Sequence, residues 1–133
     1  YIIVTGAHLS KKFGLTYKEI ISDGFKINEK INLNLKNDTS VGIIKSINKG
    51  SIGFVKAYKK LKPDILLVLG DRYEIFAAAL AANFSKIPII HLHGGETTEG
   101  SADEALRHSI TKMSHLHFTS TEQYRKRVIQ QYE

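Results

Sequence analysis

The sequence of 133 residues contains no cysteine and no tryptophan, and it has only two prolines and one methionine. Without cysteine the chain has no disulfide bond, no thiolate metal ligand and no cysteine nucleophile. No apolar run approaches the roughly 18 residues that a membrane-spanning helix needs, and no charged-then-apolar leader opens the chain. We therefore expect no membrane partner and a cytoplasmic location.

Acidic residues are in the minority, because 19 lysines and arginines face 13 aspartates and glutamates, which gives a formal net charge of +6. A basic chain invites a nucleic-acid interpretation. The lysines are scattered, however, and the densest basic stretches, 56–62 and 125–127, lie on predicted helix faces with apolar partners. Aromatic and basic residues are not interleaved as in RNA-recognition sheets. We favour solvated helix faces over a nucleic-acid surface, and a nucleotide sugar is compatible with the charge.

Apolar runs and helical periodicities alternate along the chain. Strands are predicted at 1–5, 65–69, 88–93 and 115–119, with a weaker, alternating one at 26–33,. Helices are predicted at 15–22, 39–61, 73–84, 103–113 and 121–132, although Gly50 and Gly53 weaken the continuity of the second,. This alternation implies right-handed βαβ crossovers and strands that are buried on both sides. We predict an α/β fold, a Rossmann-like parallel sheet with helices on both faces.

Polar loops follow three of the predicted strands. They are Thr5-Gly6-Ala7-His8, Gly70-Asp71-Arg72-Tyr73-Glu74, and the glycine-rich segment from His93 to Gly100. In open parallel sheets, ligands bind outside the carboxyl ends of the strands. The convergence of these loops at one edge predicts a binding or active site there, but it does not name a reaction.

Each acidic candidate in these loops also has a structural interpretation. Asp71 with Glu74 matches a helix capping box, as does Ser101 with Glu104. For Glu104 we favour the structural role, whereas for Asp71 capping and ligand binding are equally supported. Asp103 has the spacing of an i,i+4 ion pair with Arg107, or it points into the cleft.

Histidines recur at alternate positions of two predicted strands. His91 and His93 resemble paired metal ligands, but His91 lies in the middle of an apolar run, where a packed core histidine is plausible. The core interpretation is stronger for His115 and His117. We therefore favour no metal site, and keep a metal hydrolase with His91 and His93 as ligands as an alternative.

Several motifs together resemble the hydrolysing UDP-N-acetylglucosamine 2-epimerases. The resemblance lies in Thr5-Gly6-Ala7-His8-Leu9-Ser10 with Phe13-Gly14-Leu15-Thr16, and in Val68-Leu69-Gly70-Asp71-Arg72-Tyr73-Glu74. It is most specific from His91 through His93-Gly94-Gly95-Glu96 and Asp103-Glu104 to Arg107-His108 and Ile110-Thr111-Lys112. The similarity spans essentially the whole chain.

The resemblance implies a place in a larger enzyme. Members of this family have a two-domain fold of the glycosyltransferase-B type, with the active site in the cleft between two Rossmann-like domains. Residues 1–133 would form the N-terminal domain without its first strand, and the C-terminal UDP-binding domain would be absent. The chain opens without Met on the apolar run Tyr1-Ile2-Ile3-Val4, which also suggests a piece of something longer. The family tends to form dimers or tetramers, so a homo-oligomer is expected.

The resemblance also implies a reaction. A base removes the C2 proton of the UDP-sugar while UDP leaves C1, and water then adds to the resulting 2-acetamidoglucal. Asp71 and Asp103 would be acid/base groups and Glu96 a stabiliser or second base. The substrate-binding residues carried over by position are His8, Arg72, His93, Gly94, Gly95, Arg107 and His108. No metal and no cofactor are required.

Two alternatives to this reading stay open. The same chemistry could act on a UDP-2,4-diacetamido-trideoxyhexose instead of UDP-N-acetylglucosamine. The loops could also form a nucleotide-sugar binding module that transfers no proton.

Overall fold

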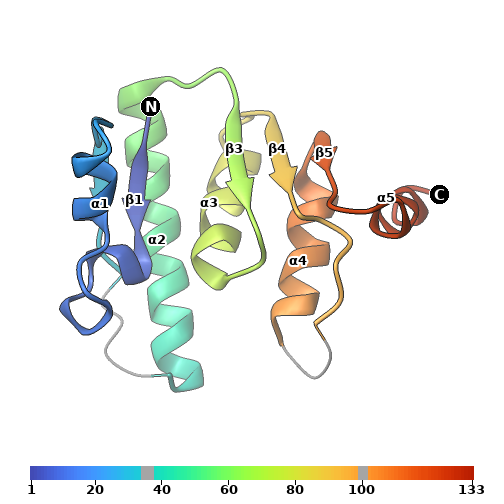
Figure 1. Cartoon of the computed structure of the whole chain (residues 1–133), viewed down its shortest axis with the longest axis horizontal. Helices are drawn as coiled ribbons and strands as arrows, with labels where there is room; N and C mark the ends of the chain where they lie inside the picture. The colour runs from blue at the N-terminus through green and yellow to red at the C-terminus, as the bar shows by residue number, and fades with distance from the viewer. Residues whose placement is uncertain (34–37, 99–101) are drawn as a thin grey trace. The chain divides into compact units, whose positions relative to one another are not determined.

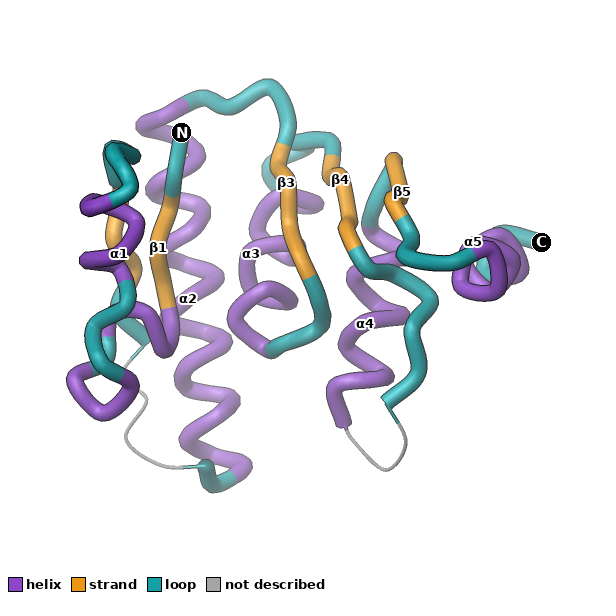
Figure 2. The backbone as a smooth tube through the Cα atoms, in the orientation of Figure 1, coloured by secondary structure: helices purple, strands orange, loops and turns teal. Residues whose placement is uncertain are grey.

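The computed structural model describes residues 1–33, 38–98 and 102–133, and it divides the chain into two compact units, Tyr1–Lys62 and Pro63–Glu133. Figure 1 shows the order of the elements along the chain, and Figure 2 shows which segments are helix, strand and loop. Each unit is an α/β arrangement with parallel strands. The two units are described separately below.

The first unit has a two-stranded parallel sheet. Strand β1 (Ile3–Thr5) pairs with β2 (Glu29–Ile31), with Ile3 opposite Glu29 and Thr5 opposite Ile31. Two 3-10 turns, η1 (Gly6–Leu9) and η2 (Lys11–Phe13), and the short helix α1 (Tyr17–Ser22) connect the two strands. Sequence periodicity gave no sign of these 3-10 turns, because each is only three or four residues long.

Helix α2 (Ser40–Leu61) completes the first unit and runs without interruption. Its N-cap is Thr39, whose hydroxyl accepts a hydrogen bond from the Gly42 N–H at 3.1 Å,. The reservation about Gly53 was unnecessary. A Cβ at Gly53 would lie 2.7 Å from Ile31 Cγ2, so glycine is what allows the helix to approach β2 this closely,.

The second unit has a three-stranded parallel sheet in the order β3-β4-β5. The strands are β3 (Leu66–Leu69), β4 (Ile89–Leu92) and β5 (Leu116–Phe118). The helices are α3 (Tyr73–Phe84), α4 (Ala102–Met113) and α5 (Glu122–Gln130). All predicted strands and long helices are therefore confirmed, with ends that differ by a few residues. The strands form two sheets in the described residues, where one was predicted.

The core of the second unit lies between its sheet and helices α3 and α4, which Figure 1 shows on the same side of β3 and β4. Ile89 and Ile110 are fully buried there, and Val68 is 5% exposed. Side chains alternate across a strand, so Leu67, Leu69 and Phe118 belong to the opposite face, where they are more than half exposed,. The sequence predicted helices on both faces of the sheet. Within this unit, α3 and α4 both cover the face to which Val68 belongs. Across the described residues, no helix is both long and apolar enough to cross a membrane.

The turn after β4 packs directly on the backbone of α5. Gly95 has a φ of +78°, and a Cβ there would lie 2.4 Å from the carbonyl oxygen of Tyr124. Gly70 also has a positive φ, +84°, but nothing lies within 4 Å of its Cβ position. Gly70 is therefore required only by its backbone conformation, whereas Gly95 is required by its conformation and by the close contact with α5.

We predict that Gly95→Ala lowers the free energy of unfolding by about 2–4 kcal/mol, since it adds a backbone clash to the strain of a left-handed alanine. Gly70→Ala is the matched control and should cost about 1 kcal/mol, because only the conformational strain applies. Urea unfolding followed by circular dichroism measures both. Equal losses for the two variants would contradict the steric role of Gly95.

Candidate active site

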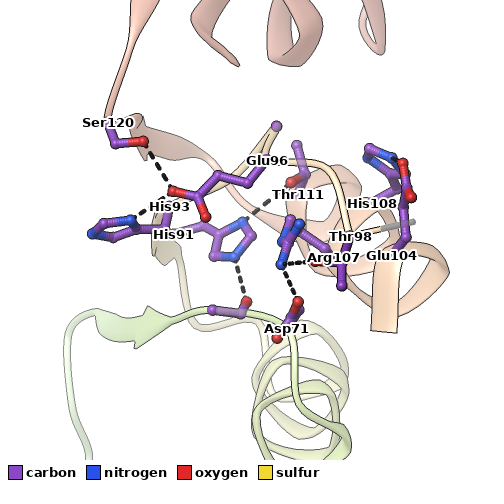
Figure 3. Close-up of polar contacts among 12 residues, drawn as sticks. Asp71, His91, His93, Glu96, Thr98, Glu104, Arg107, His108, Thr111 and Ser120 are labelled. Atoms are coloured by element: carbon purple, nitrogen blue, oxygen red, sulfur yellow. Dashed lines mark hydrogen bonds and ion pairs between the residues drawn. The ribbon is translucent and has the colours of Figure 1, made fainter. Parts of the chain in front are cut away.

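Asp71 lies immediately after β3, and its carboxylate forms an ion pair with Arg107 of α4 (Figure 3). Both side chains are largely buried, with exposed fractions of 17% for Asp71 and 7% for Arg107. The capping interpretation of Asp71 is wrong, because the N-cap of α3 is Arg72, whose side chain makes no cap hydrogen bond. Asp71 instead pairs with Arg107, and a ligand role, the other interpretation of its position, stays a prediction.

Arg107 is only partly satisfied by this pair. Its Nη2 donates to Asp71 Oδ2 and, at 3.1 Å, to the hydroxyl of Thr98. Its Nε and Nη1 are buried and lack a hydrogen-bond partner among the residues that the structure describes. Guanidinium groups do not deprotonate in proteins, and buried donors are nearly always paired. Nε and Nη1 of Arg107 are therefore donors of the kind that anionic and carbonyl groups accept from.

His91 is completely buried at the centre of this region. Its Nε2 lies 2.8 Å from the carbonyl oxygen of Gly70, and its Nδ1 lies 3.2 Å from the hydroxyl of Thr111. A carbonyl only accepts, so Nε2 carries the proton and Thr111 donates to Nδ1. Burial lowers the pKa of His91 below its usual value; the nearby charges of His117 and Arg107 reinforce this, against the hydrogen bond to Gly70,.

The arrangement of His91 confirms the core interpretation and argues against the metal alternative. Both of its ring nitrogens are occupied by protein groups, so no lone pair points outward. Over the described ranges, no cluster of three or more His, Asp or Glu side chains is suitable for a metal ion. The core interpretation is wrong for His115, which is exposed, while His117 is half-buried and contacts the hydroxyl of Tyr132 at 3.0 Å.

Glu96 forms a second cluster, in the loop that follows β4. Its Oε1 accepts from the Nδ1 of His93 at 2.7 Å and from the hydroxyl of Ser120 at 2.9 Å (Figure 3). The hydrogen bond from His93 holds the pKa of Glu96 below its usual range; partial burial opposes this, and Ser120 and the charge of Arg107 add to it. Arg107 thus acts on the carboxylates of both loops.

Arg72 links the remaining carboxylates. Its Nε lies 3.3 Å from an oxygen of the buried Glu74, and its guanidinium also feels the charge of Asp103, in the first turn of α4. Burial alone would lower the pKa of Arg72, but the attraction of Glu74 and Asp103 outweighs it and raises that pKa. Of the three predicted carboxylates, Asp71 thus contacts an arginine directly, whereas Glu96 and Asp103 are only within the electrostatic influence of Arg107 and Arg72.

Two predicted substrate-binding residues lie outside this cluster. His108 contacts Glu104 at 3.5 Å and the side-chain amide of Gln131 at 2.5 Å, which ties both its ring nitrogens to the outer side of α4. This ion pair gives Glu104 a structural role; Ser101, the other half of its predicted capping box, lies outside the described residues. His8 belongs to the first unit, where its Nδ1 lies 2.8 Å from the Thr16 hydroxyl.

The glycine-rich turn is held from two sides. A Cβ at Gly94 would lie 3.1 Å from the Thr111 hydroxyl and 3.2 Å from His91 Nδ1. Arg127 of α5 contacts the hydroxyl of Thr97 and, at 3.4 Å, the carbonyl of Gly95. Sequence patterns missed Ser120, Arg127 and Thr111, because contacts between distant segments leave no local signal. Only the position of Ser120 directly after a predicted strand could have suggested it.

The burial of His91 predicts a pH dependence of stability. Its folded-state pKa lies below the unfolded value of 6.5, so its contribution is fully present above pH 6.5 and is lost as pH falls below that value. We expect the stability advantage of the wild type over His91→Gln to shrink between pH 7.5 and 5.5, by at most about 1.4 kcal/mol per pH unit. Urea unfolding of both proteins at the two pH values measures this, and a constant or growing advantage would contradict it.

Known proteins are similar to this chain in sequence and in fold. The profile of the UDP-N-acetylglucosamine 2-epimerase family matches residues 1–133. A GDP/UDP-N,N'-diacetylbacillosamine 2-epimerase (hydrolyzing) from Campylobacter jejuni is 51% identical over 129 residues, which are 97% of this chain and 33% of that protein. A UDP-N,N'-diacetylbacillosamine 2-epimerase (hydrolyzing) from Legionella pneumophila is 44% identical over 96% of this chain and 34% of its own length.

A solved structure supports the fold. The crystal structure of the Methanocaldococcus jannaschii UDP-GlcNAc 2-epimerase in complex with UDP-GlcNAc and UDP superimposes with a TM-score of 0.82 at 25% identity, over 100% of this chain and 36% of that one. The chain thus spans about a third of the length of its curated relatives. On the match of the family profile to every residue, the chain belongs to the UDP-N-acetylglucosamine 2-epimerase family.

Proposed function

We propose that the protein containing these 133 residues is a hydrolysing 2-epimerase of a UDP-linked 2-acetamido sugar. The observation that carries this proposal is the charge arrangement of the second unit. Asp71 forms an ion pair with Arg107, Arg72 feels the charge of Asp103, and Glu96 feels the charge of Arg107. Carboxylates can move protons at a sugar carbon, and arginines bind diphosphates and stabilise a departing one.

The proposed reaction has two steps. First the C2–H bond breaks and its electron pair forms a C1=C2 double bond, while the C1–O bond breaks and its electron pair leaves with UDP. Water then adds across the double bond of the 2-acetamidoglucal. Its hydroxide binds C1, and a proton binds C2 on the face opposite to the one that lost the original C2 proton. The first step develops positive charge at C1, which neighbouring carboxylates stabilise.

Site roles follow from the contacts. Arg107 has two buried donors without a partner in the part of the chain that the structure describes, and in our proposal they bind the diphosphate or the acetamido carbonyl. Asp71 and Asp103 serve as acid/base or charge-stabilising groups, while Arg72, His93 and the Gly94-Gly95 turn contact the substrate. His108 and His8 stay proposed substrate contacts only through the family resemblance, since their described partners are Glu104, Gln131 and Thr16.

The sugar itself has two candidates. The family profile is named for UDP-N-acetylglucosamine, whose epimerisation gives N-acetylmannosamine, a precursor of sialic-acid-type sugars. The relatives at 51% and 44% identity are named for N,N'-diacetylbacillosamine, a diacetylated amino sugar. These two names are the reason to keep the UDP-2,4-diacetamido-trideoxyhexose as a candidate substrate beside UDP-N-acetylglucosamine.

The rest of the active site lies outside this chain in our proposal. Residues 1–133 form part of the N-terminal domain of a two-domain glycosyltransferase-B-type enzyme, and a C-terminal domain grips the UDP. A homo-oligomer, dimer or tetramer, completes the assembly. The length of the relatives, about three times that of this chain, supports a further domain.

We predict that the full-length protein releases UDP from one of the two UDP-sugars, and that the sugar product has inverted C2. Mass spectrometry and proton NMR of the products formed from each substrate identify the true one. The isolated 133 residues should release no UDP, because half of the cleft is missing. Absence of UDP release from both sugars by the full-length protein would contradict the proposed function.

Removal of either acid/base candidate tests the catalytic assignment. We expect Asp71→Asn and Asp103→Asn in the full-length enzyme to lower kcat by about 10²- to 10⁴-fold, the usual contribution of a general acid or base. Asp64→Asn is the matched control, because Asp64 is exposed and precedes β3. Turnover within a few-fold of wild type in both variants would refute the assignment. A protein that binds UDP-sugar but never turns it over would instead be a binding module.

A further inference from the structure

The hydrogen bonds of Glu96 leave that carboxylate poorly placed to act as a base itself. One oxygen, Oε1, accepts from both the His93 ring and the Ser120 hydroxyl. The two donors come from opposite ends of the cluster, the loop after β4 and the segment before α5. A carboxylate fixed by two donors orients its partners, and the group that it orients here is an imidazole.

The partner of Glu96 has a defined tautomer. An ionised carboxylate only accepts hydrogen bonds, so the Nδ1 of His93 carries the proton. The neutral ring therefore has its lone pair at Nε2. The His93 side chain is 51% exposed, whereas that of Asp71 is 17% exposed and already paired with Arg107. Among these groups, His93 has an accessible basic atom that no described residue is shown to occupy.

The backbone holds His93 in an unusual conformation. Its φ is +62°, which is uncommon for a residue other than glycine,. Its N–H donates to the carbonyl of Phe118 at 2.9 Å, and the next two residues are the closely packed Gly94 and Gly95. Strained backbone of this kind persists where the surroundings enforce it, and it concentrates at functional sites. The strain here sets the direction of the imidazole ring.

We propose that His93 is the base that removes the C2 proton, with Glu96 as its positioning carboxylate and Ser120 as the anchor of Glu96. This inference rests on the proposed function and names the Nε2 atom of His93 as the proton acceptor in the first step of the proposed reaction. The lone pair of Nε2 takes the C2 proton, the C–H electron pair forms the C1=C2 bond, and UDP leaves with the C1–O electron pair. The resulting imidazolium is stabilised by Glu96 and then loses its proton to water.

His93→Gln in the full-length enzyme gives the main test. A glutamine amide can still donate to Glu96, but it has no basic nitrogen. On the sugar that the wild type turns over, we expect UDP release to fall by about 10²- to 10⁴-fold in kcat, with KM within a few-fold. The matched control is His115→Gln, which changes an exposed histidine directly before β5 whose ring contacts a backbone N–H. This control should keep wild-type kcat.

Chemical rescue separates a base from a structural role. We expect added imidazole to restore at least ten-fold of the lost kcat to His93→Ala, and substrate deuterated at C2 to slow that variant by a primary isotope effect. Glu96→Gln and Ser120→Ala should each lower kcat less than His93→Gln does. The double variant with His93→Gln and Glu96→Gln should have the same kcat as His93→Gln alone. Glu122→Gln, an exposed carboxylate-to-amide change on α5, is the control for Glu96→Gln. Melting temperatures confirm that each variant is folded.

The outcomes are distinct from those of the proposed function. A folded His93→Gln protein with kcat within three-fold of an active wild type overturns this inference and leaves the proposed function standing. So does a His93→Ala protein that imidazole does not rescue. A wild type that forms no C2-inverted sugar overturns both.

Discussion

The buried ion pair between Arg107 and Asp71 is the constraint on which the site depends. An arginine that is 6% exposed cannot shed its charge, and an unpaired charge in such a position costs several kcal/mol,. Asp71 offsets part of this cost by neutralising the guanidinium through Nη2. Nε and Nη1 still lack partners among the described residues, and these are the donors to which we assign a ligand in the proposed function.

A second link between the same two elements keeps this pair in place. Gly70 precedes Asp71, and Thr111 is one helical turn after Arg107 on α4,. His91 joins Gly70 to Thr111 through its two ring nitrogens, parallel to the bridge from Asp71 to Arg107. Because His91 is buried and neutral, it adds no charge beside Arg107. A positively charged ring at this position would compete with Arg107 for Asp71, which explains why the neutral form suits the site.

Much of this could be predicted from the sequence, but the contacts between distant side chains could not. Strands and helices leave local periodicities, and the strand-end rule placed Asp71 and Glu96 correctly in the loops after β3 and β4. Asp71 looked equally good as a helix cap, because the competing partner, Arg107, is 36 residues away. Ser120 and Glu96 are 24 residues apart, and their contact is equally invisible to local patterns. The resemblance supplied the chemistry, but the pairing of side chains had to come from the fold.

The different surroundings of the carboxylates indicate a division of labour. Asp71 is held by an arginine, while Glu96 is held by a histidine and a serine. Environments that differ in this way make chemically similar groups behave differently, as an acid and a base must in one site. In the proposed reaction, a carboxylate paired with arginine suits a fixed negative charge near C1, where positive charge would develop. A carboxylate paired with an exposed imidazole suits the task of orienting that ring and stabilising it once protonated, so our proposal assigns proton transfer to the loop after β4.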